Sequence, residues 1–122
     1  MSIWKSEDVR TIVATAQFFL GAALLVAPLL FGFEGESSAA WTARASGGLI
    51  GLIAIVNFAD DQNWPAWANL MTGAWTIAAP WIIQFAENGA ALWSHLVVGL
   101  LVVLTSVWEI FNSENWTPRV TA

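Results

Sequence analysis

The chain has 122 residues, of which 57% are hydrophobic and 11% are charged, and its formal net charge at pH 7 is −5. Soluble domains carry about 25% charged residues, so the composition argues against a soluble protein, and the negative charge argues against a nucleic-acid partner. Because the chain has no cysteine, disulfides, thiol nucleophiles and thiolate metal sites are excluded. The length fits one domain, and we expect a single membrane domain over residues 1–122.

Four apolar stretches follow one another along the chain, each about as long as the twenty residues needed to cross a bilayer core. We predict helices, because an open strand in lipid leaves backbone groups unpaired and four strands cannot close a barrel. The segments between the stretches are short and polar. The fold class predicted is therefore all-α, an integral membrane four-helix bundle, with helices over about residues 11–31, 40–59, 65–85 and 91–111.

The chain also resembles itself. At an offset of 52 residues, thirteen of the forty-nine pairs between Ala16–Trp64 and Ala68–Trp116 are identical, including Pro28 with Pro80. We interpret this as two tandem two-helix repeats, over about residues 11–60 and 64–112. An even number of spans gives both repeats the same orientation, which predicts a pseudo-twofold axis along the membrane normal.

Two-helix repeats also place both termini on one side of the membrane. Lys5, Arg10 and Arg119 fall on that side and Arg44 on the other. Cytoplasmic segments carry the excess of Lys and Arg, so we predict cytoplasmic termini.

Nine tryptophans are present, and most fall at the ends of the predicted helices, as in the aromatic belts of membrane proteins. Trp75 is an exception, because it lies near the middle of the third stretch, at the position equivalent to Ala23 in the first repeat. The predicted interface anchors are Trp41, Trp64, Trp81, Trp93 and Trp116.

Prolines and glycines supply the backbone features of the repeat. Pro28 and Pro80 each remove a hydrogen bond to the carbonyl four residues earlier, so we expect them to kink or end the first and third helices. Small residues allow membrane helices to approach closely, within one chain or between copies. The predicted packing glycines are Gly21, Gly47, Gly51, Gly73 and Gly99, and Gly47 with Gly51 forms the first candidate contact between copies.

Four polar residues lie within the apolar stretches, toward the predicted cytoplasmic ends. Gln17 is repeat-equivalent to Asn69, and Asn57 to Glu109; we call these four residues the polar collar. One interpretation is hydrogen bonding between helices, worth about 0.6 kcal/mol per contact. The other is a site for a proton, a cation or a polar headgroup.

Arg44 and His95 lie toward the opposite side. Arg44 is predicted to pair with Glu34 or Glu36, or to extend to lipid phosphates. His95 is the single histidine, and its imidazole either hydrogen-bonds a neighbour or ligates a haem or a chlorin. No other cofactor is predicted.

The order of residues in each half resembles the SPW-repeat family of small bacterial integral membrane proteins. The resemblance rests on Gly73-Ala74-Trp75 and Ala79-Pro80-Trp81 in the second half, and on Gly21-Ala22 and Ala27-Pro28-Leu29 in the first. The serine of the name-giving motif is alanine in both halves, and its tryptophan is Leu29 in the first. The resemblance implies two helices per repeat and a bacterial inner membrane, and it carries no activity.

The sequence contains no catalytic arrangement: paired His and carboxylate spacing, phosphate-binding glycine loops and metal-ligand clusters are all lacking. We therefore expect a non-catalytic membrane scaffold, accessory or oligomer-forming subunit, whose partners are the lipid bilayer and either further copies of the chain or another membrane protein. The alternatives are a subunit that binds a haem or chlorin through His95, and the movement of protons or small solutes past Glu109.

Overall fold

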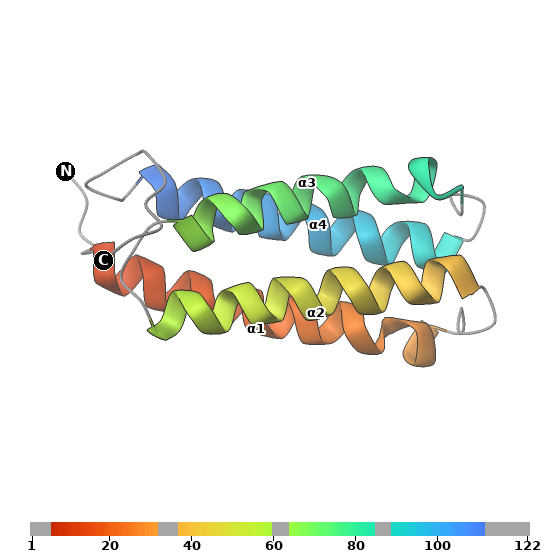
Figure 1. Cartoon of the computed structure of the whole chain (residues 1–122), viewed down its shortest axis with the longest axis horizontal. Helices are drawn as coiled ribbons and strands as arrows, with labels where there is room; N and C mark the ends of the chain where they lie inside the picture. Colours follow the sequence, from red (N-terminus) through yellow and green to blue (C-terminus); the bar gives the residue numbers. More distant parts are fainter. Residues whose placement is uncertain (1–5, 32–36, 60–63, 85–88, 112–122) are drawn as a thin grey trace.

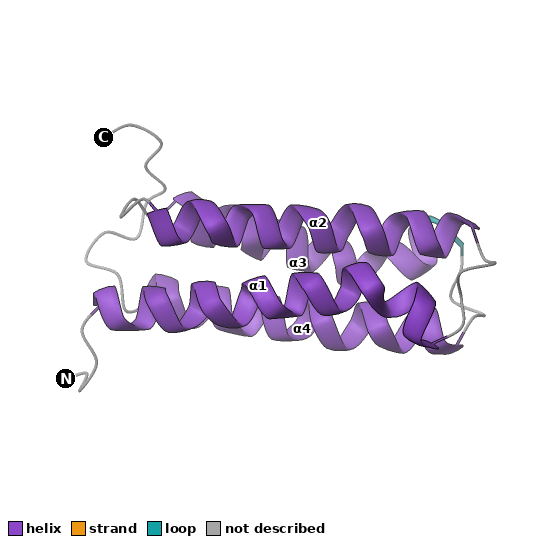
Figure 2. Ribbon diagram, turned by 90° about the horizontal axis from the view of Figure 1, so that it is seen from below, coloured by secondary structure: helices purple, strands orange, loops and turns teal. Residues whose placement is uncertain are grey.

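The chain folds into four helices that lie side by side (Figures 1 and 2). The computed structural model describes residues 6–31, 37–59, 64–84 and 89–111. The helices are α1 (Ser6–Phe31), α2 (Ser37–Ala59), α3 (Trp64–Ile82) and α4 (Gly89–Phe111). The predicted all-α four-helix bundle is confirmed, and α1 begins at Ser6 rather than near residue 11.

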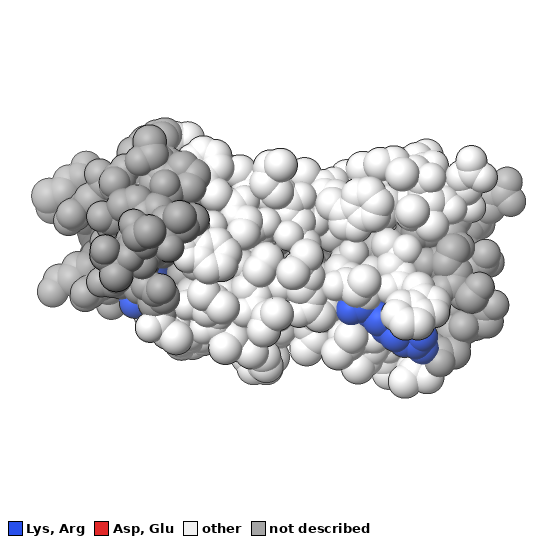
Figure 3. Space-filling model, viewed as in Figure 1, with Lys and Arg blue, Asp and Glu red and all other residues white. Residues whose placement is uncertain are grey.

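Three of the helices are long and apolar enough to cross a membrane, over Val9–Leu30, Ala39–Ala59 and Gly89–Phe111. The remaining helix, α3, has 19 residues and is not among these candidate spans. Its polar side chains Asn69, Thr72 and Thr76 are all buried against the other helices, so its outward face remains apolar. Figure 3 shows α2 and α3 in front, and the middle of this face carries no charged side chain.

The four helices form two hairpins, α1 with α2 and α3 with α4, and the hairpins meet through contacts of α1 with α4 and of α2 with α3. Figures 1 and 2 together place the helices at the four corners of a square. We call the end that holds Ser6 and Phe111 the terminal end. The opposite end, where α1 and α3 end and α2 and α4 begin, is the hairpin end.

Glycines set the spacing of the first hairpin. A Cβ atom added to Gly47 would lie 2.5 Å from the carbonyl oxygen of Gly21, and one added to Gly21 would lie 2.6 Å from that of Gly47. Real Cβ atoms do not approach backbone this closely, so α1 and α2 pack at a separation that only glycine permits. In contrast, a Cβ atom on Gly51 would meet no other atom within 4 Å.

The second hairpin repeats this contact 52 positions later. A Cβ atom on Gly99 would lie 2.9 Å from the carbonyl oxygen of Gly73. The two hairpins therefore use equivalent glycines, as expected if a twofold axis relates them. The axis, and the duplication that it would reflect, stay predictions.

Small and polar side chains lie inside the bundle and large apolar side chains lie outside, as expected for a protein surrounded by lipid. The interior holds small or polar residues together with a few larger apolar side chains, among them Leu24 and Ile50, both fully buried. Large apolar side chains point outward: Phe19 is 65% exposed and Leu30 is 71% exposed. In water such a surface would be a large apolar patch, whereas in a bilayer it is the contact surface for lipid chains.

Both prolines lie inside their helices and are buried. The helices continue past them, α1 to Phe31 and α3 to Ile82, so neither helix ends at its proline. The end of α3 has a different cause, because Gln84 adopts a positive φ of 70°, the left-handed conformation that commonly terminates helices.

Candidate functional site

Gln17 is the centre of a hydrogen-bond network inside the bundle. Its side chain is fully buried on α1. The amide nitrogen Nε2 donates to Thr105 Oγ1 and to Ser106 Oγ, each at 2.9 Å, and lies 3.3 Å from the carbonyl oxygen of Val102. The amide oxygen Oε1 accepts a 2.7 Å bond from Asn69 Nδ2. One side chain of the first hairpin thus binds both helices of the second.

The network also reaches α2, because Asn69 Nδ2 lies 3.4 Å from the carbonyl oxygen of Ile50. The threonine hydroxyl groups of α3, in contrast, form hydrogen bonds within their own helix: Thr72 donates to the carbonyl of Ala68 and Thr76 to that of Thr72. Serine and threonine in membrane helices commonly satisfy themselves in this way. The network around Gln17 is therefore the polar connection between hairpins at this level.

A second polar pair lies nearer the terminal end. Asn57 Nδ2 donates a 2.8 Å hydrogen bond to Glu109 Oε1, and both side chains are buried. Arg10 of α1 interacts electrostatically with this carboxylate. Asn57 Oδ1 and Arg10 Nε are buried and have no hydrogen-bond partner among the residues that the structure describes. Asn57 thus keeps an acceptor and Arg10 a donor beside the carboxyl group.

The polar collar is therefore two layers of paired residues that cross the bundle interior. The sequence placed the four residues near one end of the bundle, and the structure brings Gln17 against Asn69 and Asn57 against Glu109. Each residue bonds to its own counterpart in the other repeat. Under a twofold axis, a residue touches its counterpart only where both lie close to that axis.

His95 is fully buried on α4, and its Nδ1 lies 2.8 Å from the carbonyl oxygen of Ala91, one turn earlier in the same helix. The part of the chain that the structure describes holds no group of three or more His, Cys, Asp or Glu residues that could bind a metal ion. Arg44, on α2, is half-buried. The two proposed partners of Arg44, Glu34 and Glu36, lie outside the described residues.

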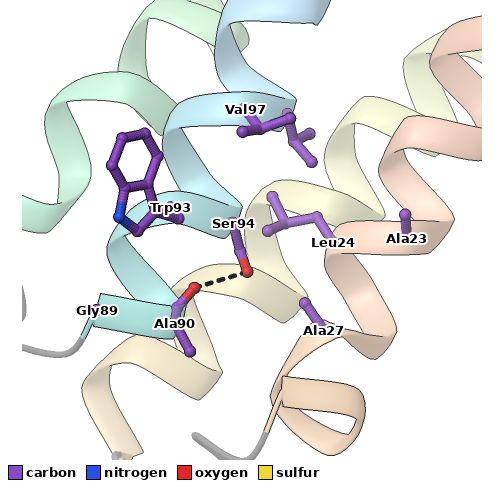
Figure 4. Close-up of a pocket in the computed structure, with 9 residues that line it drawn as sticks. Ala23, Leu24, Ala27, Gly89, Ala90, Trp93, Ser94 and Val97 are labelled. Carbon is purple, nitrogen blue, oxygen red and sulfur yellow. Dashed lines mark hydrogen bonds between the residues drawn. The ribbon is translucent and has the colours of Figure 1, made fainter.

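A groove of about 370 Å³ opens between α1 and α4 near the hairpin end (Figure 4). This groove was not predicted from the sequence, although the replacement of Trp75 by Ala23 at the equivalent position of the first repeat was a signal for it. The walls are apolar apart from Ser94, whose hydroxyl donates a 2.7 Å bond to the carbonyl of Ala90. The lining residues are Ala23, Leu24 and Ala27 of α1 and Gly89, Ala90, Trp93, Ser94, Val97 and Val98 of α4.

Three of the predicted interface anchors lie near the hairpin end and are exposed: Trp41, Trp81 and Trp93. Trp64 is half-buried at the start of α3, and Trp116 lies outside the described residues. This distribution suits a bilayer, because indole rings favour the boundary between headgroups and hydrocarbon.

A bundle of apolar helices with its polar side chains turned inward is the architecture of an integral membrane protein. The model of the SPW repeat domain matches residues 11–109, and the chain belongs to this family. The resemblance seen in the sequence is thereby confirmed. Searches of curated proteins and of solved structures give no significant match.

Proposed function

We propose that this protein is a non-catalytic structural subunit of the membrane, acting as a scaffold, an accessory subunit or an oligomer-forming unit. The observation that supports this proposal most strongly is the direction of its polar groups. The side-chain amides of Gln17 and Asn69 form hydrogen bonds between helices, while large apolar side chains cover the outside. Such a bundle is suited to holding its shape and to presenting apolar surfaces.

The outward face of α2 is the surface we assign to assembly. Membrane helices associate where small residues allow close approach. Gly47 does not contribute to this face, because α1 occupies the space beside it. Gly48 is exposed, and Gly51 packs its backbone near Gly21 of α1 but is half-buried. A Cβ atom on either glycine would meet nothing within 4 Å, and Leu52 beside them is 60% exposed.

Native mass spectrometry of the full chain, extracted gently from its source membrane, tests the proposal. We expect masses at multiples of the chain or with added protein subunits. The double variant Gly48→Leu, Gly51→Leu should shift these species toward the single chain, because two large side chains block close approach. Ala74→Leu, at an exposed position of α3, is the matched control and should leave them unchanged.

Two results would count against this assignment. A single chain without protein partners in the unaltered sample would contradict the scaffold proposal itself. Assemblies that persist in the double variant would contradict only the choice of the α2 face.

A second candidate function, proton or small-solute movement, is favoured by the pair at the terminal end. Glu109 is a buried carboxylate beside Asn57 and Arg10, and intramembrane ionisable residues commonly mark ion pathways. Flux measured in vesicles containing the purified protein should fall in Glu109→Gln if this pair takes part. Flux that does not respond to the substitution would remove the candidate.

Cofactor binding at His95 stays a prediction from the sequence. His95 does not line the groove between α1 and α4, so this groove does not favour it. The visible absorption spectrum of the purified protein provides the test. A haem or chlorin band that is lost in His95→Ala would establish the ligand, and an unaltered protein without such a band would end the hypothesis.

A further inference from the structure

The groove between α1 and α4 runs in the same direction as the lipid chains around it. Its lining runs from Gly89 to Val98 along α4, which is about 14 Å at the rise of an α-helix, and it follows α1 from Ala23 to Ala27. All these residues belong to the membrane-spanning segments Val9–Leu30 and Gly89–Phe111. The groove therefore runs along the helices and opens toward the hydrocarbon of the bilayer.

Small side chains line the groove, and one of them is replaced by a large one in the other repeat. Ala23 stands on its α1 wall, and the residue 52 positions later is Trp75 on α3, which is 41% exposed. An indole at position 23 would occupy most of the space that the alanine leaves open. The two repeats thus differ in side-chain size at this position, and the chain itself supplies a substitution that would narrow the groove.

Ser94 offers no donor to a ligand, because its hydroxyl donates to the carbonyl of Ala90, as the dashed line in Figure 4 shows. Trp93, at the end nearer the membrane boundary, is 65% exposed, and indoles favour that boundary. An occupant is therefore recognised by shape and dispersion contacts, with an apolar body in the groove and any polar part beyond Trp93.

We infer that this groove binds one acyl chain of a membrane lipid, with the lipid headgroup at the hairpin end of the bundle. An empty groove would forfeit dispersion contacts along its walls, and lipid chains are the molecules that surround its opening. A helix of a second copy is about 10 Å wide with its side chains. A space of about 370 Å³ that extends about 14 Å along α4 is too narrow to hold one. The site is separate from the α2 face and does not depend on assembly.

Photo-crosslinking of the full chain tests this site. The protein is reconstituted into phosphatidylcholine vesicles that contain a minor fraction of phosphatidylcholine with a diazirine in one acyl chain, and lipid adducts are mapped by peptide mass spectrometry after irradiation. We expect adducts to concentrate on Ala23, Ala27 and Val97. Ile82 of α3 is 59% exposed and does not line the groove, so adducts on it report ordinary contact with surrounding lipid and serve as the internal reference.

Two variants fill the groove from opposite walls. Ala23→Trp acts from α1 and Val97→Trp from α4; both positions are exposed, so neither substitution forces a side chain into the bundle interior. Each should lower groove adducts relative to the Ile82 reference by about tenfold, which corresponds to about 1.4 kcal/mol. Ala74→Trp adds the same side chain at an exposed position of α3 that does not line the groove, and it should leave the ratio unchanged.

Three outcomes would overturn the inference. The first is adducts spread evenly over the outward faces of all four helices. The second is groove adducts that persist in both filling variants. The third is a protein side chain of another copy crosslinked into the groove, which would identify an interface between proteins in place of a lipid site.

Discussion

Gly47 and Gly51 are the first and last residues of one five-residue GxxxG motif on α2, yet the structure predicts different effects when each is changed to alanine. A Cβ atom at position 47 would lie 2.5 Å from the carbonyl oxygen of Gly21 and 2.7 Å from the amide nitrogen of Leu25. Both are backbone atoms, so no side chain can rotate away. A Cβ atom at position 51 meets nothing within 4 Å.

The magnitude follows from these distances. Ordinary contact would require α1 and α2 to separate by about 1 Å, and overpacking of this kind costs about 1–3 kcal/mol. Alanine at an open helical position is instead favoured over glycine by about 1 kcal/mol. The gain from alanine applies at both positions, because both lie inside α2. Gly47→Ala should therefore lower the free energy of unfolding relative to Gly51→Ala by about 1–3 kcal/mol, the cost of overpacking at position 47.

Reversible unfolding in mixed micelles of a mild detergent and dodecyl sulfate measures this difference, with helicity followed by circular dichroism. If Gly51→Ala destabilises the protein as much as Gly47→Ala does, the conclusion that a side chain at position 47 meets α1 while one at position 51 meets open space is refuted.

Three further predictions use the same unfolding assay. Gln17→Leu should cost about 2 kcal/mol, since it removes three short interhelical bonds worth about 0.6 kcal/mol each; a double-mutant cycle with Asn69→Leu should return a coupling near the value of one bond, and no coupling would contradict the pairing. Asn57→Leu should cost about 1–3 kcal/mol, because it leaves the buried Oε1 of Glu109 without its donor, whereas Glu109→Gln keeps an acceptor and should cost less; the reverse order would argue against the assigned donor and acceptor. Gly73→Ala should be milder than Gly47→Ala, because the nearest atoms are the side-chain methyl groups of Val103 and Val102 at 2.9 and 3.0 Å, which can move; equal losses would count against that difference.

The helices were predictable because membrane thickness fixes their length. Twenty apolar residues between polar turns leave little choice of structure in lipid, and the ends of α2 and α4 lie within two or three residues of the predicted limits. The start of α1 was not predictable in this way. Ser6, Glu7 and Asp8 are too polar for a membrane span, yet a helix can continue beyond the hydrocarbon.

The partners of the polar residues could not be predicted, because hydrophobicity alone does not orient these helices. A helix with apolar residues on every side has no periodic signal to show which face meets protein. The offset of 52 residues identified Gln17 and Asn69 as equivalents, but equivalence does not imply contact. The same limit applies to Gly47 and Gly51, whose opposite surroundings depend on how α1 crosses α2.

Identical units that pair about a symmetry axis must present the same side chain to each other at the centre. Two glutamates facing one another there would repel, because like charges at a buried site oppose ionisation. Joining the halves in one polypeptide removes that restriction. Position 57 can keep an amide while position 109 carries an acid, and the amide donates to the acid at 2.8 Å. A single chain can thus hold a lone carboxylate at its centre, which a symmetric pair of hairpins could not do.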